Sequence, residues 1–267
     1  MKLAVLGDPL VFTLSPVLHR AGFEALGLPG ESEALRVPRA HLGSTLARLA
    51  AAGYRGVNLT HPLKQAVIEH LAETSDAARR AGSVNTVSFG PGTTRGDTTD
   101  GAGFIALLEH LGVGAAGASV VLLGAGGAAR SLSLALVGAG AARVTAWARR
   151  PGEASAAWGE IAGAHVAGWD SEAGRAALAG AQVVVNATPV TGPGEPCDIR
   201  RIPRGARVVD LVYGPELTPW VRAARAAGLE AVDGLGLLVF QARCSLALWT
   251  GREVPFAPLA VAVGWPR

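Results

Sequence analysis

Lys64 is the residue whose type and setting point most directly to acid–base chemistry. The chain has 24 Lys and Arg residues, yet its only lysines are Lys2 and Lys64. A lysine ammonium can give and take a proton, which a guanidinium cannot do in a protein. The Asp100 carboxylate could pair with this ammonium and orient it. A lysine taken alone is more often an exposed helix residue, so the polar residues near Lys64 must decide between the two interpretations.

Three polar segments accompany Lys64, each at a point where an apolar strand is expected to end. They have the sequences TLSP at 13–16, NLTHPLK at 58–64 and SVNT at 83–86, with GDTTDG close behind at 96–101. Ligands of open α/β sheets bind outside the carboxyl ends of the strands, so we expect these segments to face one crevice. Hydroxyls, amides, one ammonium and one carboxylate suit a small polyhydroxylated acid.

The second chemical signal is the glycine-rich segment VVLLGAGGAAR at 120–130. An expected strand leads into the glycines and a helix follows at once, which is the setting that a dinucleotide-binding fingerprint requires. Gly124 permits the tight turn, and Gly126 lets the backbone approach a pyrophosphate at the helix N-terminus. Ala129 takes the third glycine position as a tolerated small residue. A turn selected only for packing is the alternative, and the order of strand, turn and helix argues against it.

The residues after the second expected strand of this half bear on which nicotinamide dinucleotide would bind. An NAD-binding domain usually has Asp or Glu there to hold the ribose hydroxyls. This chain has Arg149 and Arg150 instead, and no acidic residue at the strand end. A guanidinium can bind a 2′-phosphate, so the sequence favours NADP. An arginine pair solvated on a surface loop is the alternative.

Alternating strands and helices must position these residues. We expect strands at or near residues 2–7, 35, 56–60, 83–89, 120–124, 143–148, 182–188 and 207–213. We expect helices over 15–26 and 41–52, from 62, over 101–111, from the glycine-rich turn to about 138, between 148 and 182, over 216–227 and from about 235. Ser15 is the expected N-cap of the first helix, with Pro16 at its first position. The alternation predicts a mostly parallel sheet with right-handed crossovers.

The same pattern predicts two domains. The first half reads as one α/β domain of about 100 residues, the small flexible stretch 112–119 looks like a junction, and the strand–helix alternation restarts after it. A length of 267 residues suits one large or two medium domains. The predicted fold class is therefore α/β, with an N-terminal α/β domain and a C-terminal Rossmann-type dinucleotide-binding domain.

Composition argues against several other classes of protein. The chain is 49% hydrophobic with a mean hydropathy of +0.32, but no apolar run reaches the ~18 residues that span a bilayer, and no signal peptide is recognisable. Cys197 and Cys244 have no metal-type spacing, so we expect thiols in a reducing cytoplasm and no metal. The net charge is only +3 and the arginines are scattered, which argues against binding of nucleic acid.

His19 is expected to be a hydrogen-bonded structural residue, and His61 a loop or cap residue.

Taken together, these motifs resemble the shikimate dehydrogenase family over nearly the whole chain. The matching segments are TLSPVLH, NLTHPLK, SVNT, TDG, GAGGAAR, NATP, DLVY and DGLGLLVFQA. Each is weak alone, whereas their order and spacing are specific. The resemblance implies that the final helices return to the N-terminal domain. Residues 1–100 and 237–267 would then form the substrate-binding and catalytic domain, and residues 101–236 the NADP-binding domain, with the active site in the cleft between them.

The resemblance also implies roles for individual residues. Lys64 and Asp100 would form the catalytic pair. The substrate carboxylate would be bound by Thr13 and Ser15 with help from the Tyr213 hydroxyl, and the ring hydroxyls by Asn58, Thr60, Asn85, Asp100 and Gln241. On the cofactor side, Gly124, Ala125, Gly126, Gly127 and Ala128 would meet the pyrophosphate, Arg149 and Arg150 the 2′-phosphate, and Thr188, Leu211 and Gly234 the ribose and nicotinamide.

The activity that the resemblance implies is the reversible NADPH-dependent reduction of 3-dehydroshikimate to shikimate, a step of aromatic amino acid biosynthesis. The chain departs from the usual family pattern at a few positions. Thr13 stands where Ser is common, Thr98 where Asn is more frequent, and Ala148 and Arg150 flank Arg149 in place of Asn and Thr.

Two other functions stay open from the sequence. A quinate/shikimate or related hydroxy-acid dehydrogenase belongs to the same class. A non-catalytic dinucleotide sensor belongs to another class, and Lys64 with Asp100 argues against it because a sensor needs no acid–base pair. The sequence is compatible with a monomer or a homodimer.

Overall fold

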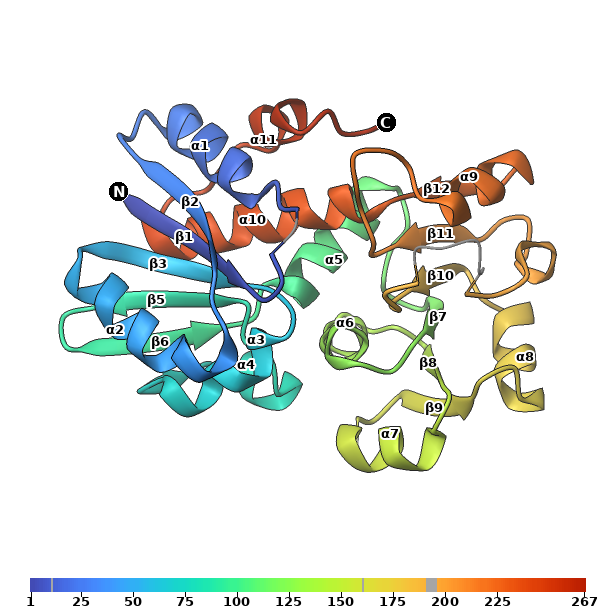
Figure 1. The fold of residues 1–267 in the computed structure, drawn as a ribbon. Helices are drawn as coiled ribbons and strands as arrows, with labels where there is room; N and C mark the ends of the chain where they lie inside the picture. The colour runs from blue at the N-terminus through green and yellow to red at the C-terminus, as the bar shows by residue number, and fades with distance from the viewer. Residues whose placement is uncertain (11, 160, 191–195) are drawn as a thin grey trace. The chain divides into compact units, whose positions relative to one another are not determined.

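The computed structural model describes residues 1–10, 12–159, 161–190 and 196–267. They form two compact units (Figure 1). Unit 1 contains Met1–Gly103 and Leu238–Trp265, and unit 2 contains Phe104–Leu237 and Pro266–Arg267. Each unit is built on a six-stranded sheet. Within the described ranges, no helix has the length and apolar character needed to cross a membrane.

The sheet of unit 1 has the strand order β2-β1-β3-β5-β6-β4. Its strands are β1 (Lys2–Gly7), β2 (Glu31–Arg36), β3 (Tyr54–Leu59), β4 (Glu73–Thr74), β5 (Thr86–Gly90) and β6 (Thr93–Asp97). β1 is parallel to β2 and β3, and β4 is parallel to β6. β1 is central and almost entirely buried, because four of its six residues are apolar and both of its faces are covered.

The prediction of a mostly parallel sheet is wrong for the middle of unit 1. β5 is antiparallel to both of its neighbours, β3 and β6. β5 and β6 are joined by only Pro91 and Gly92, and Gly92 has a φ of 70°. A connection this short can join only antiparallel strands, and its positive φ suits glycine. The sequence reading missed this turn, and with it β6.

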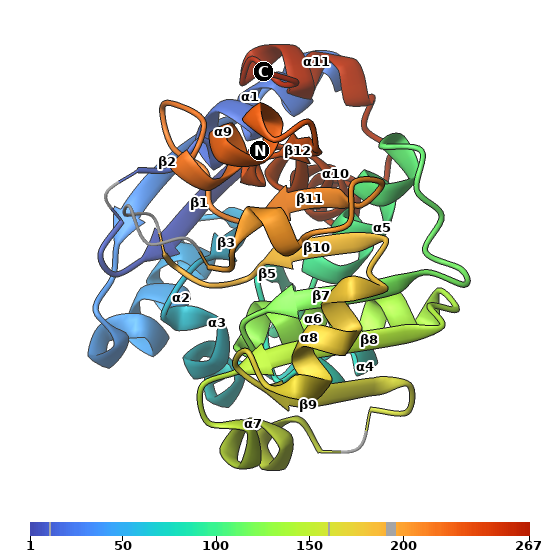
Figure 2. The same cartoon turned by 90° about the vertical axis from the view of Figure 1, so that its right-hand side faces the viewer.

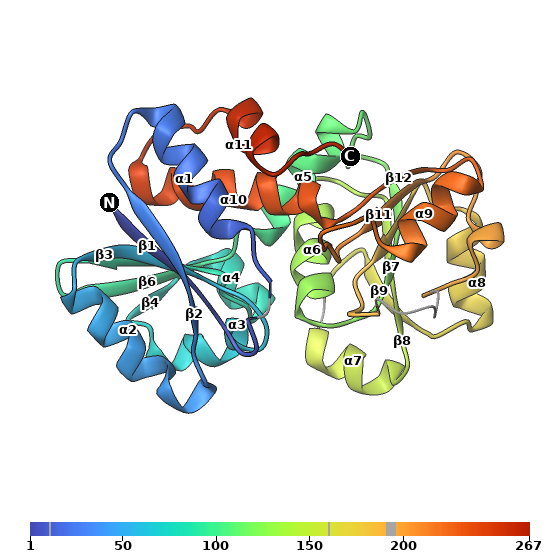
Figure 3. The same cartoon turned by 45° about the horizontal axis from the view of Figure 1, so that its top comes forward.

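Helices cover both faces of the unit 1 sheet. They are α1 (Ser15–Leu26), α2 (Leu42–Ala51), α3 (Leu63–Ala66), α4 (Asp76–Ala81), α10 (Gly234–Thr250, of which the part from Leu238 on belongs to this unit) and α11 (Phe256–Ala262), with short 3-10 turns at Arg39–His41 and Val67–His70. α1 and α10 lie on one face and α2 to α4 on the other (Figures 1 and 3). The second face encloses an apolar core of Leu, Val and Ala side chains from the sheet and from α2 and α3.

The start of α1 differs by one residue from the expectation. The N-cap is Leu14, not Ser15, and the Ser15 backbone N–H donates to Thr13 Oγ1 at 3.2 Å. The Thr13 hydroxyl therefore serves one of the N–H groups that the first turn leaves unpaired. Ser15 thus becomes the first helical residue, and Pro16 follows inside the first turn, where its missing N–H costs nothing.

Unit 2 is a parallel doubly wound fold. Its strands are β7 (Ser119–Leu123), β8 (Arg143–Ala148), β9 (Ala164–Gly168), β10 (Val183–Asn186), β11 (Arg207–Asp210) and β12 (Glu230–Val232), in the order β12-β11-β10-β7-β8-β9. Every strand pair is parallel among the described residues. This is the Rossmann strand order. Successive strands are added on one side of β7 up to β9 and then, from β10 on, on its other side, so β7 and β10 flank the switch point of the sheet. Ligands of such sheets bind at the carboxyl ends of the strands at that switch point.

The helices of unit 2 pack against both faces of this sheet. They are α5 (Asp100–His110, of which the part from Phe104 on belongs to this unit), α6 (Gly127–Gly138), α7 (Pro151–Trp158), α8 (Glu172–Ala179) and α9 (Pro219–Ala226). α8 and α9 lie on one face and α6 on the other (Figure 2). An apolar core beneath α8 and α9 includes Leu178 and Trp220. The sequence reading expected only one helix between β8 and β10 and no strand there, so it missed β9; it also missed β4, α4, β12 and α11.

Gly103 gives a direct test of how α5 packs on α10 within unit 1. A Cβ atom at Gly103 would lie 2.7 Å from Gln241 N and 2.9 Å from Gln241 Cα. Because these are backbone atoms, Gly103→Ala must push the two helices apart, and we expect a loss of about 1–3 kcal/mol of stability. Thermal unfolding measures this loss. In the control Gly138→Ala, on α6, the added Cβ meets no atom within 4 Å. That variant should be neutral or slightly stabilised, and equal midpoints for the two variants would contradict the packing argument.

Candidate active site

The predicted pairing of Lys64 with Asp100 is present in unit 1. Lys64 Nζ donates to Asp100 Oδ2 at 2.6 Å. The Lys64 side chain is 28% exposed and the Asp100 side chain only 5%. An ammonium has three donors, and this bond is the only one that Lys64 Nζ makes to the described residues. Two N–H groups of the ammonium are therefore available to a ligand.

Asn85 holds the other oxygen of the Asp100 carboxylate. Asn85 Nδ2 donates to Asp100 Oδ1 at 2.8 Å and to Thr99 Oγ1 at 2.9 Å, while Asn85 Oδ1 accepts from the Thr99 backbone N–H at 2.8 Å. A backbone N–H can only donate, so it fixes which end of the amide carries the oxygen. Asn85 is 3% exposed. The Asp100 carboxylate is thus held at both oxygens by buried or half-buried donors, which fixes its orientation.

The antiparallel hairpin explains how these residues meet. The segment SVNT leads into β5, whose first residue is Thr86, and does not lie, as expected, at the end of a strand. Because β5 runs opposite to β3 and β6, its first residue lies beside their last ones: Thr86 is opposite Asn58 on β3 and opposite Asp97 on β6. The start of β5 and the ends of β3 and β6 therefore share one edge of the sheet. Lys64 is held at the same edge of the sheet by its backbone, because its carbonyl accepts from the Val84 N–H at 2.8 Å.

Asn58 lies behind this pair and is hydrogen-bonded at both ends of its amide. Its Oδ1 bonds His19 Nε2 at 2.9 Å, and its Nδ2 bonds Asn85 O at 2.9 Å, Thr86 Oγ1 at 3.0 Å and Ser245 Oγ at 3.1 Å. His19 is completely buried, and its Nδ1 bonds Ser32 Oγ at 2.8 Å. Asn58 thus supports the backbone that carries Asn85. Its Nδ2 hydrogens are already used, whereas its Oδ1 accepts one bond and has a second lone pair that could accept from a substrate hydroxyl.

His19 is confirmed as a hydrogen-bonded structural histidine, and it is neutral at pH 7. Asn58 Nδ2 faces the Asn85 carbonyl, so Asn58 Oδ1 must accept from the protonated Nε2 of His19. His19 Nδ1 then accepts from the Ser32 hydroxyl. Burial lowers the pKa of His19 to about 4, and this effect exceeds the opposing effect of the Asn58 hydrogen bond.

The sequence analysis included Thr86 and Thr99 in its polar segments but gave neither an individual role, and it missed Ser245 altogether. Ser245 Oγ lies 2.8 Å from Thr86 Oγ1 and 3.2 Å from Thr99 Oγ1, and it donates to the Gln241 carbonyl at 3.0 Å. A signal was present, because Ser245 follows Gln241 by four residues and so lies on the same side of a mostly apolar helix. All three hydroxyls are buried. They connect α10 to the start of β5 and the end of β6.

The remaining predicted substrate residues lie in both units. Thr13 and Ser15 form a pair at the start of α1, with their hydroxyl oxygens 3.3 Å apart. Thr60 follows β3 and its carbonyl accepts from the Leu63 N–H, which begins α3. Gln241 is half-buried on α10 in unit 1. Tyr213 belongs to unit 2, where it is half-buried just after β11.

The predicted glycine-rich turn of unit 2 follows β7 and leads directly into α6, as expected. Gly124 has a φ of 116°, which few other residues adopt, and a Cβ there would lie 3.0 Å from the Ala187 carbonyl after β10. Gly126 is the N-cap of α6, and a Cβ there would point into open space. The backbone at this turn can therefore approach a ligand closely, and the first N–H groups of α6 favour an anion.

A cavity of about 760 Å³ opens at this turn. The predicted cofactor residues in its lining are Gly124, Ala125, Gly126, Arg149, Arg150 and Thr188. Gly127 and Ala128, which begin α6, and Leu211 and Gly234 lie outside that lining. Leu211 and Gly234 instead touch each other closely, since a Cβ on Gly234 would lie 2.3 Å from the Leu211 carbonyl oxygen. Only glycine fits at position 234.

The two arginines at the end of β8 are not equivalent. Both are exposed and line the cavity, but Arg150 Nη1 forms an ion pair with Glu153 Oε2 at 3.0 Å. Arg149 has no ion pair within the ranges that the structure describes. The sequence reading noted no acid at the strand end and overlooked Glu153, one turn into α7, which lines the same cavity. Arg149 is therefore the guanidinium better placed to bind an added anion.

Thr188 is held in place by a buried polar pair. Asn186 Oδ1 accepts from Thr188 N at 3.0 Å and from Thr188 Oγ1 at 2.7 Å, and Asn186 Nδ2 donates to Asp210 Oδ1 at 2.9 Å. Asp210 is fully buried, and this burial raises the pKa of its carboxyl, an effect that its hydrogen bonds from Thr218, Val212 and Asn186 oppose. These bonds connect the ends of β10 and β11, two of the three described strands on that side of the switch point.

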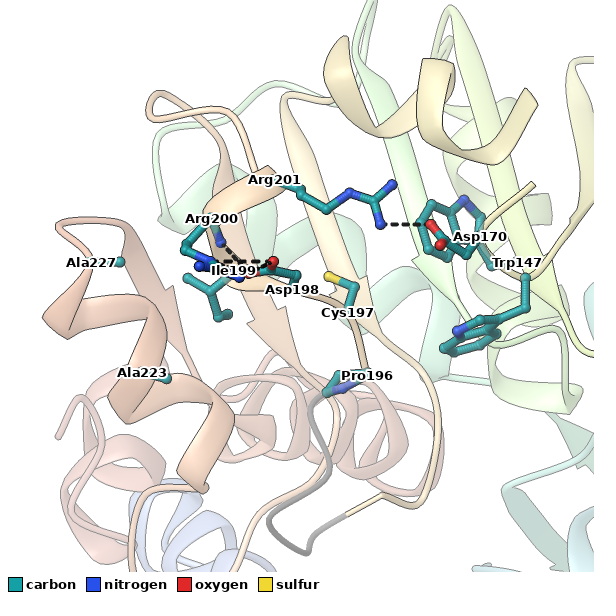
Figure 4. Close-up of a pocket in the computed structure, with 11 residues that line it drawn as sticks. Trp147, Asp170, Pro196, Cys197, Asp198, Ile199, Arg200, Arg201, Ala223 and Ala227 are labelled. Carbon is teal, nitrogen blue, oxygen red and sulfur yellow. Dashed lines mark hydrogen bonds and ion pairs between the residues drawn. The ribbon is translucent and has the colours of Figure 1, made fainter. Parts of the chain in front are cut away.

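A second cavity of unit 2, about 680 Å³, contains none of the predicted residues (Figure 4). Its charged groups are already paired: Arg201 Nη1 lies 2.6 Å from Asp170 Oδ1, and Arg200 Nη2 lies 2.8 Å from Asp198 Oδ2. The hydrogen bonds from Arg200 also lower the pKa of Asp198. Each of the two arginines that line this cavity therefore has a carboxylate partner.

The fold and these two sites define a class of protein. A doubly wound unit with a glycine-lined cavity, on the same chain as a partly buried lysine–aspartate pair, is the arrangement of a nicotinamide-dependent oxidoreductase that uses general acid–base chemistry.

Comparisons with known proteins define the family. The family model described as "Shikimate dehydrogenase substrate binding domain" matches residues 5–87. The curated shikimate dehydrogenase (NADP(+)) of Symbiobacterium thermophilum is 40% identical, over 99% of this chain and 95% of that protein. The crystal structure of shikimate 5-dehydrogenase from Thermus thermophilus in complex with NADP(H) and shikimate is 36% identical, with a TM-score of 0.87 over 99% of this chain and 98% of that one. This chain belongs to the shikimate dehydrogenase family.

A quinate dehydrogenase also matches the fold. The structure of this enzyme from Corynebacterium glutamicum, in complex with NAD, is 32% identical with a TM-score of 0.85, and the match covers 98% of each chain.

The buried His19 predicts an acid-sensitive step in stability. Its folded pKa of about 4 lies below the unfolded value of 6.5, so below pH 6.5 the unfolded chain binds a proton that the folded chain does not. Stability must fall as the pH drops from about 6.5 towards 4, by up to roughly 3 kcal/mol from this group. We expect His19→Gln to flatten this dependence when the free energy of unfolding is measured at several pH values. The exposed His61 provides the control variant His61→Gln, which should keep the wild-type slope, and identical slopes in all three proteins would contradict the assignment.

Proposed function

We propose that this chain catalyses the reversible NADPH-dependent reduction of 3-dehydroshikimate to shikimate. The observation that carries the proposal is the Lys64–Asp100 ion pair, held by Asn85 at a sheet edge crowded with hydroxyl and amide groups. An ammonium with two unused N–H groups beside a fixed carboxylate suits an alcohol–ketone interconversion, in which one proton must move on or off an oxygen. Unit 1 is the proposed substrate-binding and catalytic domain, and unit 2 the proposed NADP-binding domain.

The proposed substrate contacts follow from the chemistry of the side chains. The Thr13 and Ser15 hydroxyls at the start of α1 would bind the substrate carboxylate, where the helix N-terminus also favours negative charge, and the Tyr213 hydroxyl would assist. Thr60, Asn85, Asp100 and Gln241 would bind the ring hydroxyls. The Gln241 amide is half-buried and makes no side-chain bond to the described residues, so it is available for this role. We propose Asn58 for the same set, although its amide already serves His19 and Asn85.

The proposed acid–base step belongs to Lys64. A bound NADPH would supply the hydride that reduces the ketone carbon of the substrate. Protonated Lys64 donates a proton from Nζ to the ketone oxygen as negative charge develops there, and in the oxidation direction neutral Lys64 takes the proton back. Asp100 Oδ2, 2.6 Å from Nζ, orients the ammonium. Asn85 keeps the Asp100 carboxylate from rotating away. General acid catalysis of this kind is typically worth about 10²–10⁴ in rate.

The residues of unit 2 fit an NADP molecule. The open space at Gly126 and the start of α6 suit the pyrophosphate, and the 760 Å³ cavity is large enough for the adenosine half. Arg149 would bind the 2′-phosphate, with Arg150 contributing less because Glu153 already pairs with it. Thr188, Leu211 and Gly234 would lie near the ribose and the nicotinamide.

The test of this function is an assay with shikimate and NADP⁺, followed by the ultraviolet absorbance of NADPH. We expect shikimate-dependent reduction of NADP⁺, and its absence would overturn the proposal. Quinate oxidation is the second candidate, because the quinate dehydrogenase of Corynebacterium glutamicum shares the fold. Rates with shikimate and quinate, each with NAD⁺ and NADP⁺, decide between the two. Larger kcat/KM values for quinate with NAD⁺ would favour the second candidate.

Replacing Lys64 tests the catalytic assignment. Lys64→Ala should lower kcat by at least about 10², with little change in the KM for shikimate, because the proton is transferred mainly in the transition state. The only other lysine, Lys2, is exposed and pairs with Glu31, so Lys2→Ala is the matched control and should leave both constants unchanged. A rise in KM without a loss of kcat would make Lys64 a binding residue instead.

Replacing Arg149 tests the cofactor preference. A hydrogen-bonded ion pair with the 2′-phosphate is worth roughly 1.5–3 kcal/mol, so Arg149→Ala should raise the KM for NADP⁺ about tenfold or more and leave the rate with NAD⁺ almost unchanged. Arg150→Ala should have a smaller effect, since Glu153 competes for that guanidinium. The double variant should lose more than either single variant. Equal losses of kcat/KM with NAD⁺ and NADP⁺ would show that these arginines stabilise the fold and do not bind the 2′-phosphate.

A further inference from the structure

Arg267, the last residue of the sequence, packs its side chain into unit 2. Its side chain is only 23% exposed and pairs with the Asp233 carboxylate, which is 1% exposed. Arg267 Nε donates to Asp233 Oδ2 at 3.0 Å, and Nη2 bonds the same oxygen. A buried carboxylate is costly without a partner, so this pair fixes the arginine side chain firmly.

The same guanidinium also binds three consecutive backbone carbonyls. Nη2 donates to Gly214 O at 2.8 Å and to Glu216 O at 3.2 Å, and Nη1 donates to Pro215 O at 2.8 Å. Arginine has five N–H donors in a planar fork, which lets one side chain serve a carboxylate and a backbone segment together. A lysine ammonium in its place could keep the charge beside Asp233 but could not span these acceptors.

These contacts fall on the segments that carry two proposed ligand residues. Tyr213 directly precedes Gly214, and Gly234 directly follows Asp233. Asp233 Oδ1 also accepts from the Leu235 N–H at 3.2 Å, which ties it to the first turn of α10. Arg267 therefore holds the residue after Tyr213 and the residue before Gly234 in one hydrogen-bonded cluster.

The segment from Leu211 to Thr218 has several other anchors, all near its ends. The Leu211 N–H donates to Asn186 O at 2.9 Å, Val212 O accepts from the Gly234 N–H at 3.0 Å, and Leu217 O accepts from Arg222 Nη1 at 2.6 Å. Asp210 accepts from the Val212 N–H at 3.0 Å and from the Thr218 hydroxyl at 2.6 Å, so it fixes the two ends of the segment. Residues 214–216 between those ends form no helix or strand, and Pro215 and Glu216 are exposed. Their carbonyls are held from outside the segment by Arg267. Without this side chain, the middle of the segment loses its anchor while the ends keep theirs.

We propose that Arg267 is a positioning residue for substrate binding, which acts by fixing the segment that presents the Tyr213 hydroxyl. This proposal rests on the function and on the role of Tyr213 proposed above. Arg267 itself touches neither substrate nor cofactor in this scheme. Its loss therefore weakens shikimate binding only to the extent that Tyr213 contributes to that binding.

The experiment is a double-mutant cycle on Arg267 and Tyr213, read as the KM for shikimate. We expect Arg267→Ala and Tyr213→Phe each to raise this KM by about fivefold or more, which corresponds to roughly 1 kcal/mol. Because both act on the same hydroxyl, the double variant should lie within about twofold of the larger single variant. A merely structural role for Arg267 would instead multiply the two effects, and that result would overturn the proposal.

Three further measurements keep the outcomes distinct. Arg267→Lys retains the charge beside Asp233 and should fold even if Arg267→Ala does not, and it should still raise the KM for shikimate; an unchanged KM in this variant overturns the proposal. Arg222→Ala removes a different arginine–carbonyl bond, to Leu217 O at 2.6 Å, and should leave the KM unchanged. If Tyr213→Phe alone has no effect, the role of Tyr213 fails, and the positioning proposal fails with it. The proposed reaction itself still stands in that case, provided that wild-type enzyme turns over shikimate.

Discussion

The ion pair between Lys64 and Asp100 is the interaction on which the rest of unit 1 depends. Asp100 is 3% exposed, and a carboxylate removed from water is stable only with good partners on both oxygens. Lys64 serves one oxygen and Asn85 the other. Removing one partner of a fully buried pair costs about 3–5 kcal/mol, and less here because Lys64 keeps 28% of its side-chain exposure. That residual exposure also leaves the ammonium accessible to a substrate.

The demands of this pair explain the departure of unit 1 from a parallel sheet. Lys64 follows β3, Asn85 precedes β5 and Asp100 follows β6, so these three points of the chain have to meet at one edge of the sheet. An antiparallel β5 places the start of one strand beside the ends of two others. Thr86, Thr99 and Ser245 then fill the space behind the pair with hydroxyls that satisfy one another. In unit 2 the candidate site is a cavity at the switch point of the sheet. The parallel strands β7 and β10 end side by side there, which brings Gly124 and Thr188 together.

The sequence predicted well those features that depend on one residue type in a local setting. The strand–glycine–helix order around Gly124 and the pairing of the rare Lys64 with Asp100 are both present. It predicted poorly the features that depend on neighbours brought together by folding. The Pro91–Gly92 hairpin was not predicted because β6 has the sequence TTRGD, which lacks the apolar residues that mark a strand. Glu153 was not predicted as a partner of Arg150 because it lies in the helix that follows the strand end. Nothing in the residues around Arg267 indicates that its guanidinium binds carbonyls about fifty positions earlier.

The central claim is that Lys64 and Asp100 act as one catalytic unit, and a comparison of single and double variants tests it most directly. kcat for shikimate oxidation would be measured for Lys64→Ala, Asp100→Asn and the protein that carries both changes. If the carboxylate works only by orienting the ammonium, Asp100→Asn has nothing left to orient once Lys64 is gone, and the double variant should be no slower than Lys64→Ala within about threefold. Losses that multiply in the double variant would mean that the two residues act independently, and would contradict this account of the site.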